Sequence, residues 1–146
     1  MQLDTITPSD KVDFGRKDEI ASFLFKHLDA YGDPKEDILK CLDYALNEGM
    51  SRGGGFVVTA TENKRIVGAV VVNETGMSGY IPEYILVYIA VDGSQRGKGI
   101  GKKLMKSVME AANGDIALHV EPDNPARKLY ESLGFTNKYL EMRLKK

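Results

Sequence analysis

Cysteine is nearly absent from this chain, which has one, Cys41, among 146 residues. One cysteine cannot form a disulfide within the chain, and its scarcity suits a reducing compartment. Long apolar runs are also missing, since none approaches the roughly 20 residues that a membrane-spanning helix needs. The first residues lack the basic segment, followed by an apolar one, that marks a secretory signal. We therefore expect a cytoplasmic protein that does not bind a membrane.

A strong net charge is lacking as well, because 20 basic residues oppose 21 acidic ones for a formal charge of −1. No run of lysine or arginine is interleaved with aromatic residues, so nothing indicates a nucleic-acid partner. Residues 1–50 carry 11 acidic and 6 basic side chains, whereas residues 96–146 carry 6 acidic and 11 basic. This asymmetry fits solvated surface charge, or an anionic ligand on the C-terminal half and a cationic one on the N-terminal half.

The length and the apolar content of 42% suit one globular domain over residues 1–146. The N-terminal part predicts a short strand over 2–6 and a helix near 17–29, where apolar residues recur at helical spacing. A second helix is expected to run to about Asn47, with Asp33 as its N-cap and Glu36 as the capping-box acid.

The segments after Gly53–Gly55 predict strands and helices in alternation. In order they are a hairpin of strands 56–61 and 65–72, a loop over 73–82, a strand over 84–91, a helix over 100–112, a strand over 115–120, a helix from Asn124 to Gly134 and a terminal strand over 139–144. The strand over 84–91 is apolar on both faces, as expected of a strand covered on both sides. The order β-α-α-β-β-β-α-β-α-β favours an α/β fold with a mixed, mostly antiparallel sheet and helices on both faces.

A glycine-rich segment links the strand over 84–91 to the next helix. It reads Gln95-Arg96-Gly97-Lys98-Gly99-Ile100-Gly101. Glycines at alternate positions expose backbone N–H groups, and the first turn of the helix adds unpaired N–H groups and its dipole. Arg96 and Lys98 add positive charge. The pattern predicts a phosphate-binding loop.

Two common nucleotide loops fit this segment poorly. A Walker A loop needs four residues between its glycines and a hydroxyl after the lysine, but three residues separate Gly97 from Gly101, and Lys103 follows Lys102. A dinucleotide fingerprint would need glycine where Lys102 stands. A nucleotide-binding protein of either type remains a distant alternative.

The segment resembles instead the acetyl-CoA-binding signature of the GCN5-related N-acetyltransferases, Gln/Arg-x-x-Gly-x-Gly/Ala. A second block, Asn124-Pro-Ala-Arg-Lys-Leu-Tyr130-Glu-Ser-Leu-Gly134-Phe135, matches that family's Asn-x-x-Ala-x-x-Leu-Tyr-x-x-x-Gly-Phe. The resemblance covers roughly residues 56–144. It implies acetyl-CoA as the cofactor and direct transfer of acetyl to a primary amine in a ternary complex.

The resemblance also assigns residues to the cofactor. Those expected to bind it are Ile89, Ala90, Val91, Gln95, Arg96, Gly97, Lys98, Gly99, Ile100, Gly101, Lys102, Asn124 and Tyr130. The strand over 84–91 is expected to part from the next strand, so that its freed backbone groups bond the pantetheine arm. One of its N–H groups would polarise the acetyl carbonyl.

Tyr130 matches the family's tyrosine that protonates the departing CoA thiolate, because a phenol keeps its proton at neutral pH. The base that deprotonates the amine stays open among Glu83, His119, Glu121 and a water chain. Residues Met77, Tyr80, Glu83 and Tyr84 are expected to line the acceptor cleft with the first two helices. His27 and Cys41 are interpreted as structural.

The implied partner is a small-molecule or peptide amine, with a cationic one favoured by the acidic N-terminal half. No metal site is expected, and the protein is expected to be a monomer or a homodimer. The alternative from another class is a non-catalytic acyl-CoA-binding sensor or interaction module on the same fold.

Overall fold

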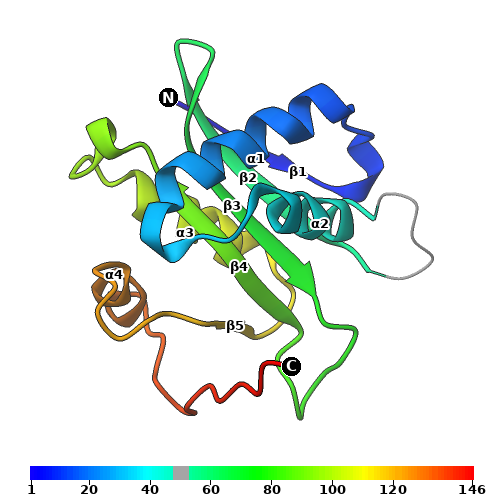
Figure 1. Cartoon of the computed structure of the whole chain (residues 1–146), viewed down its shortest axis with the longest axis vertical. Helices are drawn as coiled ribbons and strands as arrows, with labels where there is room; N and C mark the ends of the chain where they lie inside the picture. The colour runs from blue at the N-terminus through cyan, green and yellow to red at the C-terminus, as the bar shows by residue number, and fades with distance from the viewer. Residues whose placement is uncertain (48–52) are drawn as a thin grey trace.

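The computed structural model describes residues 1–47 and 53–146 and forms one five-stranded sheet in the order β1-β2-β3-β4-β5 (Figure 1). The strands are β1 (Gln2–Ile6), β2 (Gly55–Glu62), β3 (Arg65–Glu74), β4 (Tyr84–Val91) and β5 (Ile116–Leu118). The helices are α1 (Phe14–Leu28), α2 (Lys35–Ala45), α3 (Ile100–Ala111) and α4 (Ala126–Ser132). Three 3-10 turns, at Pro8–Asp10, Asp29–Tyr31 and Gly93–Gln95, lie between them.

Neighbouring strands are antiparallel except for β4 and β5, which are parallel. The predicted mixed, mostly antiparallel sheet is therefore confirmed. β3 is the middle strand of the sheet, and β4 lies next to its edge. The expectation that β4 is covered on both faces was only partly right, because Val87 keeps 36% of its surface exposed. None of the helices in the described ranges is long and apolar enough to cross a membrane.

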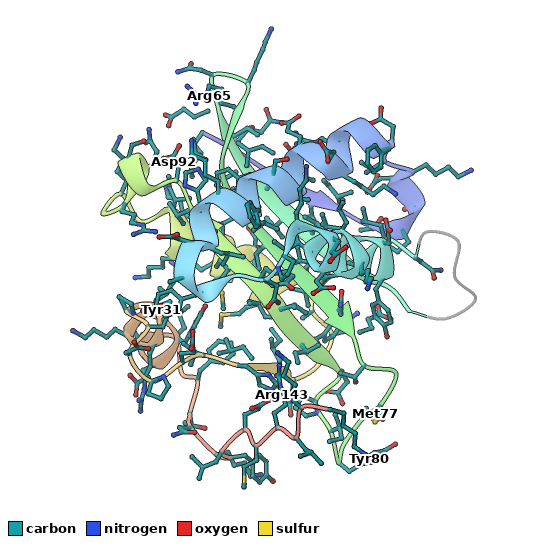
Figure 2. All side chains as sticks on the ribbon, viewed as in Figure 1. Tyr31, Arg65, Met77, Tyr80, Asp92 and Arg143 are labelled. Carbon is teal, nitrogen blue, oxygen red and sulfur yellow. The ribbon has the colours of Figure 1, made fainter. Side chains whose placement is uncertain are left out.

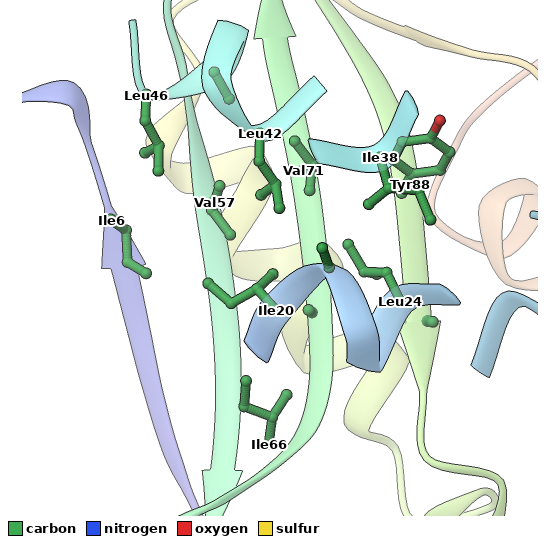
Figure 3. Close-up of a cluster of buried hydrophobic side chains, with 14 residues drawn as sticks. Ile6, Ile20, Leu24, Ile38, Leu42, Leu46, Val57, Ile66, Val71 and Tyr88 are labelled. Carbon is green, nitrogen blue, oxygen red and sulfur yellow. The ribbon is translucent and has the colours of Figure 1, made fainter. Parts of the chain in front are cut away.

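Two apolar clusters hold the helices on opposite faces of the sheet. On one face, α1 and α2 bury Ile20, Leu24, Ile38 and Leu42 against strand residues such as Val71 (Figure 3). On the other face, α3 buries its stripe of Ile100, Leu104, Met105 and Val108, together with Tyr130 from α4. Burying each such side chain contributes roughly 1.5–3 kcal/mol. The predicted layers, with helices on both faces, follow from these stripes.

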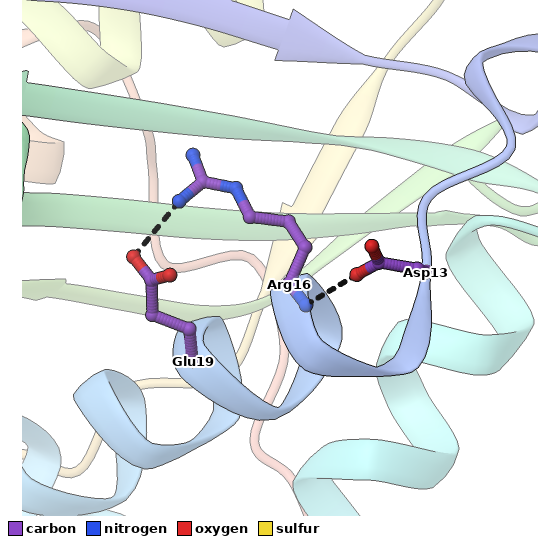
Figure 4. Close-up of polar contacts among 3 residues, drawn as sticks. All are labelled: Asp13, Arg16 and Glu19. Carbon is purple, nitrogen blue, oxygen red and sulfur yellow. Dashed lines mark hydrogen bonds and ion pairs between the residues drawn. The ribbon is translucent and has the colours of Figure 1, made fainter.

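Helix α1 begins three residues earlier than its apolar spacing predicts. The Asp13 carboxylate accepts a 2.8 Å hydrogen bond from the Arg16 N–H, which caps the first turn (Figure 4). Arg16 also forms a 2.9 Å ion pair with Glu19 on the same surface. The cap is a polar feature outside the apolar stripe, so hydrophobic periodicity missed it.

The predicted capping role of Asp33 is wrong. Pro34 is the N-cap of α2, no side chain caps that end, and the helix ends at Ala45 rather than near Asn47. The Asp33 carboxylate instead accepts a 2.5 Å hydrogen bond from the Tyr88 hydroxyl on β4. Asp33, which the local sequence pattern assigned to the start of the helix, therefore forms a tertiary contact with β4 instead of a cap.

The predicted terminal strand over 139–144 is also wrong. Residues 135–146 have no regular secondary structure, and Leu140 and Met142 are 83% and 90% exposed. The apolar alternation satisfies the period of a strand, but a strand also needs a hydrogen-bonded neighbour. β5, predicted over 115–120, spans only three residues, and β4 is its one neighbour among the described strands.

Candidate active site

The centre of the candidate site is the point where β4 and β5 part. They pair at Tyr84 with Ile116, Ile85 with Ala117 and Leu86 with Leu118, and β4 then continues to Val91 without a partner on this edge in the described structure. In Figure 1 the chain after β5 runs toward α4, while β4 continues alongside β3, so the two segments diverge. The expected parting of the two strands is therefore present.

A β-bulge at Val87 lies where the parting begins. Val71 pairs with Tyr88 and Val72 with Leu86, so Val87 is an extra residue with no partner on β3. Such a residue re-aims the chain. Leu86 accordingly packs in the α3 cluster, whereas Tyr88 packs in the cluster with α1 and α2. Sequence reasoning missed Val87, because nothing local distinguishes it from the other valines of the sheet.

Backbone N–H groups of β4 point alternately toward β3 and toward the edge that β5 has left. The Asp92 N–H donates to the Val67 carbonyl of β3 at 2.9 Å. Because N–H groups alternate in direction along a strand, those of Val91 and Ile89 point toward the opposite, unpaired edge. The same alternation directs the Ala90 N–H toward β3. Of the three residues predicted on this strand, Ile89 and Val91 thus have free N–H groups toward the opening.

The glycine-rich loop is shaped by two left-handed glycines. Gly97 and Gly99 have φ angles of 82° and 77°, which L side chains rarely adopt. A Cβ at either position would meet no atom within 4 Å, so the space beside the loop is open to a ligand. Gly101 differs, because a Cβ there would lie 3.3 Å from Leu129 Cδ2. The absence of a side chain at this position leaves room for Leu129 of α4 beside the loop.

Helix α3 presents an uncapped N-terminus next to this loop. Its N-cap is Gly99, which offers no side chain, and the first helical hydrogen bond is donated by the Lys103 N–H to the Gly99 carbonyl. The N–H groups of Ile100, Gly101 and Lys102 have no acceptor within residues 1–47 and 53–146. Open space, free N–H groups and the helix dipole together fit a pyrophosphate.

Charged side chains border the loop on two sides. Lys98 Nζ donates to Gln95 Oε1 at 2.9 Å, which holds its ammonium over the turn, and Arg96 is exposed. Asp92 opens the loop, and hydrogen bonds from the N–H and hydroxyl of Ser94 hold the pKa of its carboxylate below the usual value. His27 lies at the end of α1, and burial is the main cause that lowers its pKa. The charge of Asp92 raises the pKa of His27, and the charge of Arg96 lowers it. Asp92 lies on the loop near α1 in Figure 2.

Tyr130 is a buried phenol on α4, 6% exposed, with its ring 6.0 Å from that of Phe135. Burial raises the pKa of Tyr130 to about 12, so the hydroxyl stays protonated at neutral pH. Within residues 1–47 and 53–146 the Tyr130 hydroxyl has no hydrogen-bond partner, so its proton is not engaged by another residue. The side chain can therefore act as a proton donor.

The base candidates differ in how much of their hydrogen-bonding capacity is already used. Glu83 accepts from the Asp115 N–H at 2.7 Å and from the Gly79 N–H at 3.1 Å, and these bonds lower its pKa. A carboxylate with both oxygens engaged and a lowered pKa is a weak base, which favours a structural role. His119 and Glu121 are exposed after β5, and within the described ranges neither side chain forms a hydrogen bond.

The predicted acceptor residues do not all lie together. Met77 and Tyr80 are 40% and 80% exposed at the tip of the loop before β4, as Figure 2 shows. The Tyr84 ring packs edge-on against Phe56, 6.1 Å away, on the α3 side of the sheet. Its hydroxyl accepts a hydrogen bond from the Asn113 N–H at 3.3 Å. Tyr84 thus has a packing function, whereas Met77 and Tyr80 are accessible.

Asn124 and Cys41 have identifiable partners. The Asn124 Oδ1 accepts from the Ala126 N–H at 2.9 Å, which leaves its amide NH₂ available to a ligand. Cys41 accepts from Asn73 Nδ2 at 3.4 Å, and burial raises the pKa of its thiol to about 12. A thiol with that pKa is protonated at neutral pH and is not a nucleophile, in keeping with the structural role expected of Cys41.

The chain resembles acetyltransferases in sequence. Residues 18–135 match the sequence profile of the Acetyltransferase (GNAT) family. The N-alpha-acetyltransferase RimI of Mycobacterium tuberculosis is 31% identical over 93 residues, which are 62% of this chain and 58% of that relative. The chain spans less than two thirds of the length of the curated relatives that it matches.

Solved structures of similar fold cover almost the whole chain. Ribosomal-protein-alanine N-acetyltransferase from Brucella melitensis biovar Abortus 2308 has a TM-score of 0.68 at 18% identity, covering 99% of both chains. Aminoglycoside N-acetyltransferase AAC(6')-Iy, in complex with CoA, has a TM-score of 0.68 at 17% identity, covering 99% of this chain and 95% of that one. At such identities the likeness concerns the fold.

Proposed function

The chain belongs to the acetyltransferase (GNAT) family, and from this we propose that it transfers the acetyl group of acetyl-CoA to a primary amine by direct attack in a ternary complex. Family membership supports acetyl-CoA as the cofactor, as the sequence resemblance implies. One observation carries the proposal: β4 parts from β5 after Leu86, beside the bulge at Val87 and next to a loop with free N–H groups.

The cofactor would be held by backbone groups along two elements. The N–H groups of the loop over 96–102 and the start of α3 would bind the pyrophosphate, with positive charge from Arg96, Lys98 and Lys102. The N–H groups of Ile89 and Val91, on the free edge of β4, would bond the pantetheine arm. Acetyl-CoA supplies the thioester, whose C–S bond breaks as the C–N bond to the amine forms.

Side chains of the protein would handle the protons of the reaction. Tyr130 would donate its proton to the leaving thiolate, and it would be reprotonated through solvent by the proton that the attacking nitrogen loses as the amide forms. The amine arrives as an ammonium and must lose a proton before it attacks. Because Glu83 is engaged by two backbone N–H groups, we favour His119, Glu121 or a water held by one of them as the base.

The test is a turnover screen of the purified protein with acetyl-CoA and a panel of amines, peptides and amino sugars. We expect CoA thiol release that depends on the amine, with the acetylated amine identified by mass. Binding of acetyl-CoA without release for every acceptor would favour the alternative of an acyl-CoA sensor. Greater thermal stabilisation by ATP or NAD than by acetyl-CoA would contradict the cofactor assignment.

A further inference from the structure

The connection between α1 and α2 places a carboxylate over β4. Asp33 lies 55 residues from Tyr88 in sequence, yet its Oδ2 accepts the Tyr88 hydroxyl hydrogen bond at 2.5 Å. The Tyr88 ring is 7% exposed, whereas Asp33 is exposed to solvent. In Figure 1 the chain between α1 and α2 crosses in front of β4. Asp33 thus accepts a hydrogen bond from a buried phenol and remains exposed to solvent.

Tyr88 is the hydrogen-bond donor to the Asp33 carboxylate. Burial and the neighbouring Asp33 raise the pKa of the Tyr88 phenol, so the phenol remains the hydrogen-bond donor of the pair. Nearby lysines are engaged elsewhere, since Lys35 pairs with Asp18 at 2.7 Å and Lys40 pairs with Asp37 at 3.6 Å. Within residues 1–47 and 53–146, Asp33 forms no salt bridge.

A second acid, Asp37, also acts on the Tyr88 phenol. Asp37 lies in the first turn of α2, where it contributes to the raised pKa of Tyr88 and also pairs with Lys40 at 3.6 Å. An ammonium or guanidinium group carries several donors and a positive charge, which complements such surroundings. A second anion would be repelled.

The pair is also continuous with the candidate active site. Tyr88 directly follows Val87, the bulge residue at which β4 leaves β5, and its side chain points to the face covered by α1 and α2. An acceptor whose reacting nitrogen lies where β4 and β5 part would therefore bring a second group, farther along its own chain, to Asp33.

We propose that Asp33, oriented by Tyr88, binds a second cationic group of the acceptor, so that the protein selects diamine-type acceptors over monoamines. Asp33 is a specificity-determining residue in this scheme, and Tyr88 is a positioning residue. The inference rests on the proposed amine acetylation, and its test separates the two.

The experiment compares a linear diamine with the monoamine of the same carbon chain, in wild type and in Asp33→Asn. The readout is the ratio of kcat/KM for diamine over monoamine, measured by CoA release. We expect the Asp33→Asn ratio to fall about tenfold or more, mainly through KM, because a hydrogen bond to a charged group is lost. Tyr88→Phe should reduce the ratio less. Glu36→Gln changes an exposed acid in the first turn of the same helix and should leave the ratio unaltered.

Calorimetric binding of the diamine to the CoA-saturated protein completes the test, with folding of each variant checked by its melting transition. CoA release combined with an unchanged ratio in Asp33→Asn would overturn the cation site and spare the proposed function. Diamine binding that is lost in Asp33→Asn, without CoA release by wild type for any amine, would overturn the function and support the site. If the diamine neither binds nor reacts better than the monoamine, the site is refuted.

Discussion

The Glu83 carboxylate packs against the backbone of Gly114 and Asp115. Its Oε1 accepts the Asp115 N–H at 2.7 Å, and a Cβ built on Gly114 would lie 2.6 Å from that same oxygen. The contact ties the loop before β4 to the start of β5, the two strands whose later parting forms the candidate site. Glycine at 114 leaves room for it.

Gly114→Ala should therefore loosen this end of the site. The new methyl group would also lie 2.8 Å from Cβ and Cγ of Glu83, so the side chain must move away from Asp115. We expect a loss of about 1–3 kcal/mol in the free energy of unfolding, measured by denaturant titration. In a Glu83→Ala background the same change should cost less. Equal costs in both backgrounds would show that the clash is not the cause.

The same carboxylate predicts a pH dependence of stability. Hydrogen bonds lower the folded-state pKa of Glu83 below its ordinary value of 4.5, so its stabilising effect is present above that value and is lost as the pH falls through the folded-state pKa. Glu83→Gln should accordingly lower Tm at pH 7, and the difference from wild type should shrink as the pH falls below about 4. A difference that stays constant with pH would contradict this role.

Gly99 and Gly93 form a matched pair for testing the loop. Gly99 has a φ of 77°, whereas Gly93 lies outside the left-handed region, and a Cβ would meet nothing at either position. Gly99→Ala should cost about 1–2 kcal/mol of stability and weaken acetyl-CoA binding, while Gly93→Ala should change stability by no more than about 0.5 kcal/mol. Gly99→Asp should abolish binding by adding negative charge. Calorimetric titration with acetyl-CoA measures the affinity of each variant, and denaturant unfolding measures its stability. Equal affinities for the two alanine variants would refute the prediction.

Tyr130→Phe tests the proposed acid. We expect kcat to fall by about 10²–10⁴ with the Kd for acetyl-CoA nearly unchanged, because only the proton donor is removed. Since burial raises the pKa of Tyr130 to about 12, ionisation of this group should not reduce the wild-type kcat up to about pH 10. Tyr139→Phe makes the same chemical change on an exposed side chain and is the control. An unaltered kcat in Tyr130→Phe would remove the phenol from the mechanism.

Met142→Gln tests the absence of the predicted terminal strand. With Met142 90% exposed, the substitution should change the free energy of unfolding by no more than about 0.5 kcal/mol. Thermal or denaturant unfolding measures the change. A loss of several times that size would mean that residues 139–144 pack against the sheet in solution.

Local patterns predicted the features that local physics controls. The spacing of Ile38 and Leu42 identified α2, and the position of Gly97 and Gly99 after an apolar strand identified the glycine loop that precedes α3. The same reasoning assigned Asp33 to a helix cap and residues 139–144 to a strand. Both assignments failed because the deciding partner, Tyr88 in one case and a paired edge in the other, is not a local property.

The amino-acid sequence by itself determined the fold class, the family and the loop with its free N–H groups, because periodicity and glycine conformation act within a few neighbouring residues. Only the tertiary structure decided that Glu83 binds backbone N–H groups, that Val87 forms a bulge where β4 leaves β5, and that Asp33 faces Tyr88. Those features depend on strand register and on the crossing of the α1–α2 connection over the sheet. They are set by packing between segments far apart in the chain, which no short stretch of sequence encodes.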